Sequence, residues 1–219
     1  MTVSPASAST VLFDLDGTLV DSIGVILSSY RHTLARFGIE GVPEPVVRSW
    51  IGRALEDSFR DVAGGDASAA AAMAATYREH NIAHHDAAVA AYPGAVALVG
   101  RLRAGGRRVG IVTSKGGSLA RRGLELTGFG VVDVLVAKED TRAHKPDPEP
   151  LQHALAMLDA GPGEAVYVGD AATDLQAAEA AGMPGIGVTW GAGARADLEA
   201  RSPVAVVDTV AALAAILRA

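Results

Sequence analysis

The chain has 219 residues, of which 49% are hydrophobic and 20% are charged, and it contains no cysteine. This length allows one domain with an insertion or two small domains, and the apolar fraction is enough for a substantial core. The formal net charge of −6, without a basic run longer than two residues, argues against nucleic acids and anionic membranes as partners. We therefore expect an anionic ligand to be held locally, by a metal or by a few lysines.

No stretch reaches the roughly 18 apolar residues of a membrane-spanning helix, because Pro, Gly or a charge interrupts each run. The first nine residues, MTVSPASAS, lack the basic and apolar regions of a signal peptide. Together with the lack of cysteine, these features predict a cytoplasmic protein.

The first predicted element is a short buried strand over residues 10–15, which carries Asp14 and Asp16 at its carboxyl end. In an extended chain, residues two positions apart point the same way, so both carboxylates can face one small volume. Two like charges there need a cation or a catalytic role. Gly17 lets the chain turn directly after them, and Thr18 can hydrogen-bond back to fix the loop.

Helical patterns follow this strand without a strand signal between residues 22 and 91. Apolar residues at helical spacing predict an amphipathic helix over 22–37, with Ser22 as its cap and Gly38 as its stop. Similar patterns continue over 44–63 and 66–91, until a Tyr-Pro-Gly sequence breaks them. We expect an all-helical insertion in this part of the chain.

From Gly94 onward, short apolar strands alternate with helices, which is typical of a parallel sheet with helices on both faces. The predicted strands are 108–114, 132–137, 165–170, 185–189 and 204–207, and the predicted helices are 94–104, 117–127, 148–159, 171–181 and the residues after 207. The predicted fold class is therefore α/β. It combines a Rossmann-like parallel core of residues 1–18 and 92–219 with an all-helical insertion of residues 19–91.

Polar residues gather at the predicted carboxyl ends of these strands, where open α/β sheets bind their ligands. The residues concerned are Asp14 and Asp16 on the first strand, Thr113 and Ser114 on the second, Asp170 on the fourth, and Lys145 after the third. They come from four separate places in the sequence and would converge on one rim.

The segments DLDGTLVDS, VTSK, KPDPEP and VGDAATD resemble, in this order, the four motifs of haloacid dehalogenase superfamily phosphatases. The resemblance covers nearly the whole chain and implies that the insertion is the small helical cap of that family. Only one helix and one strand fit between Thr113 and Lys145, where other members insert a larger cap. IGRALEDSF at 51–59 and YPGA at 92–95 resemble the phosphoglycolate phosphatase and pyrophosphatase-like branch.

Two carboxylates of the first motif are our candidates for the chemistry. Attack of Asp14 on phosphorus would split a difficult hydrolysis into formation and breakdown of an aspartyl phosphate. Asp16 would protonate the leaving oxygen and later deprotonate the attacking water. A general acid/base of this kind contributes about 10²–10⁴ in rate.

The other motifs supply groups for the transferring phosphoryl group. Thr113 offers a hydroxyl and Ser114 a backbone N–H, and Thr18 is a further substrate-binding candidate. Lys145 supplies a fixed positive charge near the nucleophile and the phosphate. The prolines within 146–150 disfavour helical conformation in the residue before each of them, so we expect Lys145 in an extended segment.

Charge neutralisation by Mg²⁺ is expected, because hard oxygen ligands and phosphate oxygens suit this ion. The expected protein ligands are Asp14, the backbone carbonyl of Asp16, and Asp170, with Asp174 as a direct or outer partner. By the resemblance, the segment GDAATD that carries Asp170 and Asp174 is the metal motif. Asp174 follows Asp170 by four residues, so both can face the same rim. Alone, Asp174 could instead be an acid favoured at a helix N-terminus.

Some polar residues have two interpretations. Arg53 lies where related caps often contact the substrate, or it is an exposed arginine at a helix start. Lys115 could contact phosphate or be a solvated lysine at a helix start. His80 and His84 are i, i+4 neighbours, but no third ligand has a matching spacing, so we expect them and His85 to form a polar face rather than a metal site.

The expected function is an Mg²⁺-dependent hydrolase that releases phosphate from a small soluble compound, such as phosphoglycolate, pyrophosphate, a nucleotide or a sugar phosphate. A phosphomutase of the β-phosphoglucomutase kind shares all four motifs and remains an alternative. A dehalogenase shares the aspartyl nucleophile, but Asp16 argues against it because a halide needs no protonation. A non-catalytic binding module would have lost at least one of Asp14, Asp16, Lys145 and Asp170, and all four are present.

Closure of the cap would exclude water from the phosphoryl site and select the leaving group. We expect its hinges near residues 17–22 and 90–94. Side chains of the cap are expected to discriminate between substrates, since every candidate presents the same phosphoryl group to the core.

Overall fold

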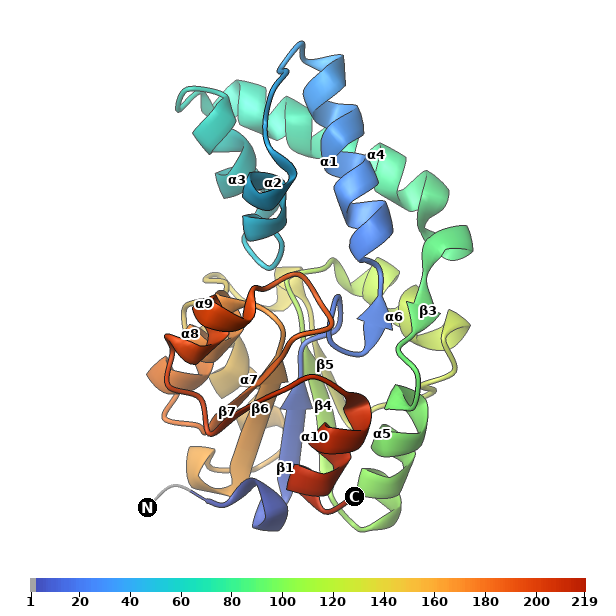
Figure 1. Cartoon of the computed structure of the whole chain (residues 1–219), viewed down its shortest axis with the longest axis vertical. Helices are drawn as coiled ribbons and strands as arrows, with labels where there is room; N and C mark the ends of the chain where they lie inside the picture. Colours follow the sequence, from blue (N-terminus) through green and yellow to red (C-terminus); the bar gives the residue numbers. More distant parts are fainter. Residues whose placement is uncertain (1–2) are drawn as a thin grey trace.

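The computed structural model describes residues 3–219. Of the first nine residues, which lack the pattern of a signal peptide, residues 1 and 2 lie outside the described part. Within residues 3–219, no helix is long and apolar enough to cross a membrane. Figure 1 shows a lower unit that contains the sheet and both chain ends, and an upper unit made of helices.

Six parallel strands form the main sheet, in the order β5-β4-β1-β6-β7-β8. They are β1 (Thr10–Phe13), β4 (Arg108–Val112), β5 (Val134–Val136), β6 (Ala165–Gly169), β7 (Gly185–Val188) and β8 (Ala205–Val207). In the central β1, Thr10 lies opposite Arg108 on one side and Ala165 on the other. All six strands expected from the sequence are confirmed, because strands buried on both faces read as continuous apolar runs.

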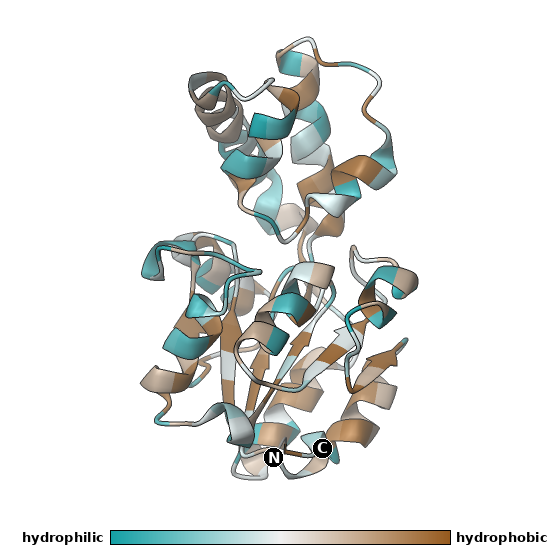
Figure 2. Cartoon of the chain, turned by 90° about the vertical axis from the view of Figure 1, so that its left-hand side faces the viewer, coloured by the Kyte–Doolittle hydropathy of each residue, from teal (hydrophilic) through white to brown (hydrophobic). Residues whose placement is uncertain are grey.

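Helices cover both faces of this sheet, as expected for the α/β class. They are α5 (Ala95–Ala104), α6 (Gly117–Leu126), α7 (Glu149–Met157), α8 (Ala172–Ala180), α9 (Arg195–Glu199) and α10 (Val210–Leu217), with 3-10 turns at Pro5–Ser7, Lys138–Asp140 and Pro162–Glu164. Because successive strand residues point to opposite faces, Val11 and Phe13 pack with α5, α6 and α10, whereas Leu12 packs with α7 and α8. Figure 2 shows the strongly hydrophobic strands inside these layers.

Four helices between β1 and α5 form the upper unit, which we call the helical unit. They are α1 (Ile23–Arg36), α2 (Glu44–Ser49), α3 (Leu55–Val62) and α4 (Ala67–Ala88). The helical unit has its own apolar core, in which the Tyr30 ring centroid lies 5.4 Å from those of both Trp50 and Phe59. The helical pattern expected over 44–63 corresponds to α2 and α3, between which the chain turns at Gly52, which has a φ of 91°.

A two-stranded ribbon connects the units. β2 (Val20–Asp21) pairs antiparallel with β3 (Ala90–Ala91), and both lie in the segments expected to contain the hinges. The sequence analysis found no strand signal between residues 22 and 91 and is wrong for β3, because two residues are too few to show a strand periodicity. Gly38, with a φ of 66°, follows the end of α1 as predicted.

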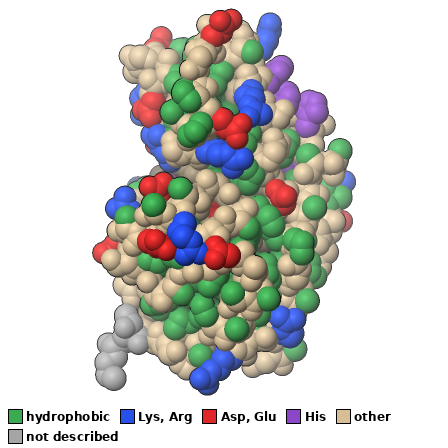
Figure 3. All heavy atoms as spheres, in the orientation of Figure 1, with side chains coloured by type: hydrophobic (Ala, Val, Ile, Leu, Met, Phe, Trp, Pro, Cys, Tyr) green, Lys and Arg blue, Asp and Glu red, His purple; other side chains and the backbone are tan. Residues whose placement is uncertain are grey.

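Three histidines stack on the outside of the helical unit. The ring centroids of His32 and His80 are 4.4 Å apart, and those of His80 and His84 are 4.1 Å apart. Figure 3 shows histidine side chains gathered on one side of the upper unit. His85 does not belong to this polar face, contrary to the expectation: it is fully buried and lies beside Gly123 of α6, where the missing side chain leaves room for its ring.

Acidification is expected to destabilise the protein partly through His80. Desolvation, followed by the neighbouring His84 and His32, lowers the pKa of His80 below its ordinary value of 6.5. The unfolded chain therefore binds more protons as the pH falls through about 6.5, and the free energy of unfolding decreases. We expect the thermal midpoint to fall less between pH 7 and pH 5 in His80→Gln than in the wild type, as measured by circular dichroism.

The matched control is His153→Gln on the exposed surface of α7. It should keep the whole wild-type decrease. Equal decreases in His80→Gln and the wild type would contradict the role assigned to the stacked histidines.

Candidate active site

Asp14 follows β1 directly and is held at the centre of the rim. Its backbone N–H donates to the Val168 carbonyl at 2.8 Å, and its Oδ1 accepts a hydrogen bond from Lys145 Nζ at 2.9 Å. Burial raises the pKa of Asp14 to about 7, although the Lys145 ammonium opposes this rise. Among the described residues no donor binds the other carboxylate oxygen, Oδ2, which leaves that oxygen available as a nucleophile.

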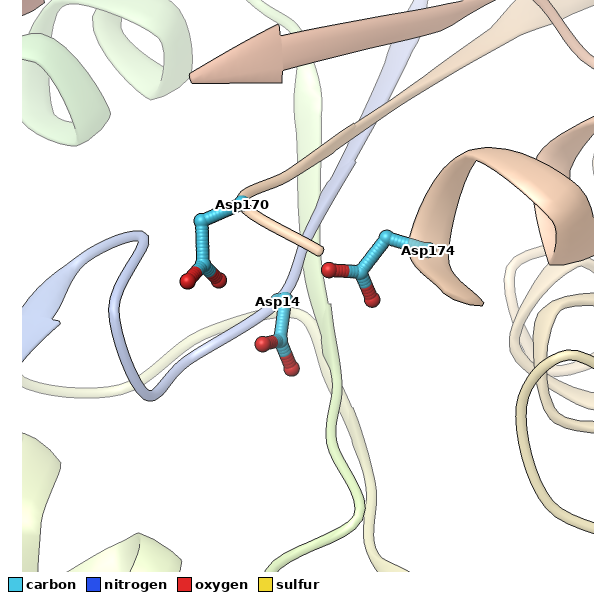
Figure 4. A group of neighbouring side chains, drawn as sticks. All are labelled: Asp14, Asp170 and Asp174. Carbon is cyan, nitrogen blue, oxygen red and sulfur yellow. The ribbon is translucent and has the colours of Figure 1, made fainter. Parts of the chain in front are cut away.

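Asp14, Asp170 and Asp174 form a buried acidic cluster in which one carboxylate oxygen of each lies within 4.8 Å of the others (Figure 4). Lys145 Nζ lies 2.9 Å from Asp14 Oδ1 and 2.6 Å from Asp174 Oδ1. Three ionised carboxylates and one ammonium leave an excess of two negative charges. Burial, followed by the charges of Asp174 and Asp14, raises the pKa of Asp170. A divalent cation would remove the excess charge, and the all-oxygen donor set suits one, so the cluster fits a metal site.

The loop of residues 189–193 encloses Asp170, and the sequence analysis did not identify it. The backbone N–H of Ala192 donates to Asp170 Oδ2 at 2.7 Å. A Cβ on Gly191 would lie 2.2 Å from that oxygen, and a Cβ on Gly17 would lie 2.3 Å from it, so both positions require glycine. The two glycines in the sequence TWGAG were the available signal, since closely spaced glycines often mark a close backbone approach.

Asp16 is oriented by two side chains that bind the same oxygen. Ser22 Oγ donates to Asp16 Oδ1 at 2.6 Å, and Lys115 Nζ donates to it at 2.8 Å. The predicted capping role of the Ser22 side chain is therefore wrong, because its hydroxyl is used here and makes no capping hydrogen bond to α1. Burial acts to raise the pKa of Asp16, but the Lys115 ammonium and the two hydrogen bonds outweigh burial and lower it.

Lys115 is not a solvated lysine, because its side chain is only 8% exposed. The structure thus removes one of the two interpretations left open by the sequence and adds the contact with Asp16. This pairing joins the loop after β1 to the start of the segment before α6.

Thr113, Ser114 and Thr18 all lie at the rim. Thr113 is buried at the end of β4, and its hydroxyl accepts a hydrogen bond from the backbone N–H of Lys115 at 3.2 Å. Ser114 Oγ donates to the Gly52 carbonyl at 3.1 Å, which links the core to the helical unit. Thr18 Oγ1 donates to Asp170 Oδ1 at 3.1 Å, so this hydroxyl positions the acidic cluster instead of bonding within its own loop as predicted.

A turn, not the predicted extended segment, presents Lys145. The backbone N–H of Asp147 donates to the His144 carbonyl at 2.9 Å and closes this turn. The helix α7 begins at Glu149, directly before Pro150. The expectation that the residue before a proline is not helical therefore fails at Glu149, because the first turn of a helix tolerates proline.

One further contact holds the cationic end of Lys145, and another holds its partner Asp174. Lys145 Nζ lies 3.1 Å from the hydroxyl of Tyr167, a buried residue of β6 that the sequence analysis did not single out. Asp174 Oδ2 accepts the backbone N–H of Ala171 at 2.9 Å. Asp174 therefore both stabilises the start of α8 and contributes a second carboxylate to the environment of Lys145.

A cavity of about 400 Å³ lies between the rim and the helical unit. Its inner end is lined by Asp14, Asp16, Thr113, Lys145 and Asp170. Arg53 lines the wall formed by the helical unit, where its guanidinium lies 2.9 Å from Asp61. The volume is within the range of about 300–1,000 Å³ that is typical of small-molecule sites.

Loss of one ion pair is expected to loosen the contact between the two units. Lys138 Nζ of the core lies 2.7 Å from Glu56 Oε2 of α3. Both groups are partly exposed, so the pair contributes about 0.2–1 kcal/mol, which salt reduces. We expect Lys138→Met to increase the radius of gyration at low ionic strength, as measured by small-angle X-ray scattering. In the wild type, salt at about 0.5 M should produce a similar increase, because it screens the same ion pair.

The matched control is Arg48→Met, which removes an ion pair of 3.0 Å with Glu44 inside the helical unit. This variant should keep the wild-type radius of gyration. An unchanged radius in Lys138→Met would show that the ion pair does not hold the units together.

Comparisons with known proteins agree with this arrangement. Residues 11–188 match the family described as haloacid dehalogenase-like hydrolase. The pyrophosphatase PpaX of Bacillus mycoides (strain KBAB4) is 39% identical over 210 residues, which are 95% of this chain and 96% of the relative. PpaX of Bacillus cereus (strain G9842) is 40% identical with the same coverage.

Solved structures share the fold over almost the whole chain. A predicted phosphatase from Clostridium acetobutylicum has a TM-score of 0.86 and 28% identity, and the match covers 97% of this chain and 99% of that one. A haloacid dehalogenase-like family hydrolase from Streptococcus pneumoniae has a TM-score of 0.82 and 25% identity, with coverages of 95% and 98%.

Proposed function

This chain belongs to the haloacid dehalogenase-like hydrolase family and is a phosphatase, and we propose that it hydrolyses small phosphate compounds through a phosphoryl group carried by Asp14. The main support is the position of Asp14, whose Oδ1 is bound to Lys145 Nζ at 2.9 Å beside two further buried aspartates. The Oδ2 atom, to which no donor among residues 3–219 is bound, is then the attacking oxygen.

We propose that the helical unit is a cap of residues 19–91 and that residues 1–18 and 92–219 form the catalytic core. The separate apolar core of the helical unit and the ribbon of β2 and β3 at the two crossings support this division.

The first step forms a bond between Asp14 Oδ2 and phosphorus and breaks the bond between phosphorus and the leaving oxygen. For this step Asp16 must first take up a proton from the solvent, since its lowered pKa leaves it ionised before the substrate binds, and it then gives that proton to the leaving oxygen. In the second step a water attacks the same phosphorus and gives a proton to Asp16. The bond to Asp14 breaks, inorganic phosphate leaves, and both aspartates return to their starting states.

Fixed groups around the phosphoryl oxygens lower the barrier of both steps. Lys145 supplies positive charge beside the nucleophile, and Thr113 and Ser114 supply a hydroxyl and a backbone N–H. Mg²⁺, held by Asp14, Asp170 and the backbone carbonyl of Asp16, with Asp174 as a direct or outer partner, would neutralise charge on the transferring group.

The test is phosphate release from pyrophosphate, phosphoglycolate, nucleoside monophosphates and sugar phosphates, measured with Mg²⁺ and with EDTA. We expect release from at least one compound, its loss in EDTA and its recovery when Mg²⁺ is restored. The Asp14→Asn variant serves as the blank. Release that EDTA does not reduce would contradict the metal requirement, and no release from any compound would contradict the hydrolase.

A further inference from the structure

A buried tyrosine of the core contacts Lys145, and the two proposed steps give it no role. Tyr167 belongs to β6, whose positions are all buried, and it is not part of the cavity lining. A phenylalanine would fill the same space without taking a hydroxyl out of water, which costs free energy unless that hydroxyl is hydrogen-bonded. The partners of this hydroxyl therefore decide what the residue does.

The Tyr167 hydroxyl completes the set of acceptors around the Lys145 ammonium, which has three N–H donors. Lys145 Nζ lies 2.9 Å from Asp14 Oδ1 and 2.6 Å from Asp174 Oδ1. The Tyr167 hydroxyl, 3.1 Å from Nζ, is the third acceptor. The side chain of Lys145 is only 1% exposed, so each of these acceptors is needed to satisfy the buried charge.

A fourth acceptor competes for the ammonium. The Val112 carbonyl lies 3.5 Å from Lys145 Nζ, which is too far for a good hydrogen bond. The Tyr167 hydroxyl donates to this carbonyl at 3.0 Å, whereas Asp174 Oδ1 is farther from the hydroxyl, at 3.3 Å, and already accepts from Lys145. A hydroxyl can donate one hydrogen bond while it accepts another. Tyr167 therefore occupies the Val112 carbonyl and offers the ammonium its own oxygen instead.

The position of this ammonium matters for the nucleophile. Lys145 engages Asp14 Oδ1, and the Oδ2 atom, to which no donor among residues 3–219 is bound, is the proposed attacking oxygen. The same ammonium supplies fixed positive charge beside the reacting phosphoryl group. Misplacement of such a group by about 1 Å can cost about 10²-fold in rate. A residue that fixes Lys145 Nζ therefore contributes to the rate without contacting the substrate.

We propose that Tyr167 is a positioning residue, whose hydroxyl holds the ammonium of Lys145 against Asp14. This proposal rests on the proposed phosphatase function and adds to it a residue that acts through Lys145. Without the hydroxyl, the third N–H of Lys145 has the Val112 carbonyl as its remaining acceptor. The ammonium then turns toward that carbonyl, and its contact with Asp14 is loosened.

The experiment uses Tyr167→Phe, which removes the hydroxyl and keeps the ring, in the full chain with Mg²⁺ and 4-nitrophenyl phosphate. We expect kcat to fall about tenfold, because the charge beside the nucleophile is misplaced. KM should change less than about twofold, because Tyr167 does not line the cavity. A crystal structure of the variant should show Lys145 Nζ within about 3 Å of the Val112 carbonyl, compared with 3.5 Å in the wild type.

The matched control is Thr33→Val, which removes another buried hydroxyl, bound to the Ser29 carbonyl at 2.8 Å within α1. This variant should keep the wild-type kcat and KM. A fall in kcat of the same size in Thr33→Val would overturn the inference, because any lost buried hydroxyl would then have this effect.

Three results for Tyr167→Phe would also overturn the inference. They are a wild-type kcat, an unmoved Lys145 Nζ in the crystal structure, and loss of the fold in the circular dichroism spectrum, since a hydroxyl that only supports the fold would act on stability alone. A wild type that releases no phosphate from 4-nitrophenyl phosphate or from any other compound would instead overturn the phosphatase function.

Discussion

Asp14→Asn is expected to abolish turnover with every phosphate substrate, lowering kcat by at least about 10⁴-fold. An uncharged amide is a poor nucleophile, and it also removes one carboxylate from the cluster that fits a metal. The fold should survive, because burial already raises the pKa of Asp14 to about 7 and a neutral side chain avoids the cost of a buried charge. Lys145 keeps its contact with Asp174 at 2.6 Å.

The proposed covalent step would give this variant a signature besides lost activity. Acid quenching of the wild type during turnover, followed by peptide mass spectrometry, should place a phosphoryl group on the peptide that contains Asp14. Asp14→Asn should show none, with an unchanged circular dichroism spectrum. The control is Asp197→Asn on the exposed surface of α9, which should retain wild-type activity. Near-normal turnover by purified Asp14→Asn would end the covalent proposal.

The core strands were predictable because burial on both faces dictates their composition. β1 is buried at all four positions and β6 at all five, so each reads as an apolar run bounded by turns. β2 and β3 have two residues each and are held together by their pairing with one another. Two residues are too few to show the alternation of apolar and polar residues by which a strand is predicted.

Within the site, the sequence motifs identified the residues at the rim but not the side chains that contact them. Asp14, Lys145 and Asp170 were placed on one rim because the carboxyl ends of parallel strands meet there. The contact between Lys115 and Asp16 joins residues 99 positions apart, and no periodicity reports it. The burial of His85 likewise depends on how α4 packs against α6, which helical spacing alone does not determine.

Asp16→Asn is expected to lower kcat for an alkyl phosphate by about 10²–10⁴-fold without unfolding the protein. The asparagine carbonyl can still accept the hydrogen bonds from Ser22 and Lys115, so the loop keeps its contacts while the exchangeable proton is lost. Ser22→Ala removes only one of the two donors that orient Asp16, so a much smaller decrease is expected from that variant.

The two roles of Asp16 can be separated with 4-nitrophenyl phosphate, whose leaving group departs without protonation. Asp16→Asn should then complete the first step and fail in the second, because no base remains to take the proton of the attacking water. Rapid mixing should show a burst of nitrophenolate near one equivalent of enzyme, followed by slow turnover, and the phosphoryl group should accumulate on Asp14. A linear time course at the wild-type rate would mean that another group activates the water. A slow linear course without a burst would mean that Asp16 acts on the first step even when the leaving group needs no proton. Asp16 would then be a positioning residue and not a general acid/base.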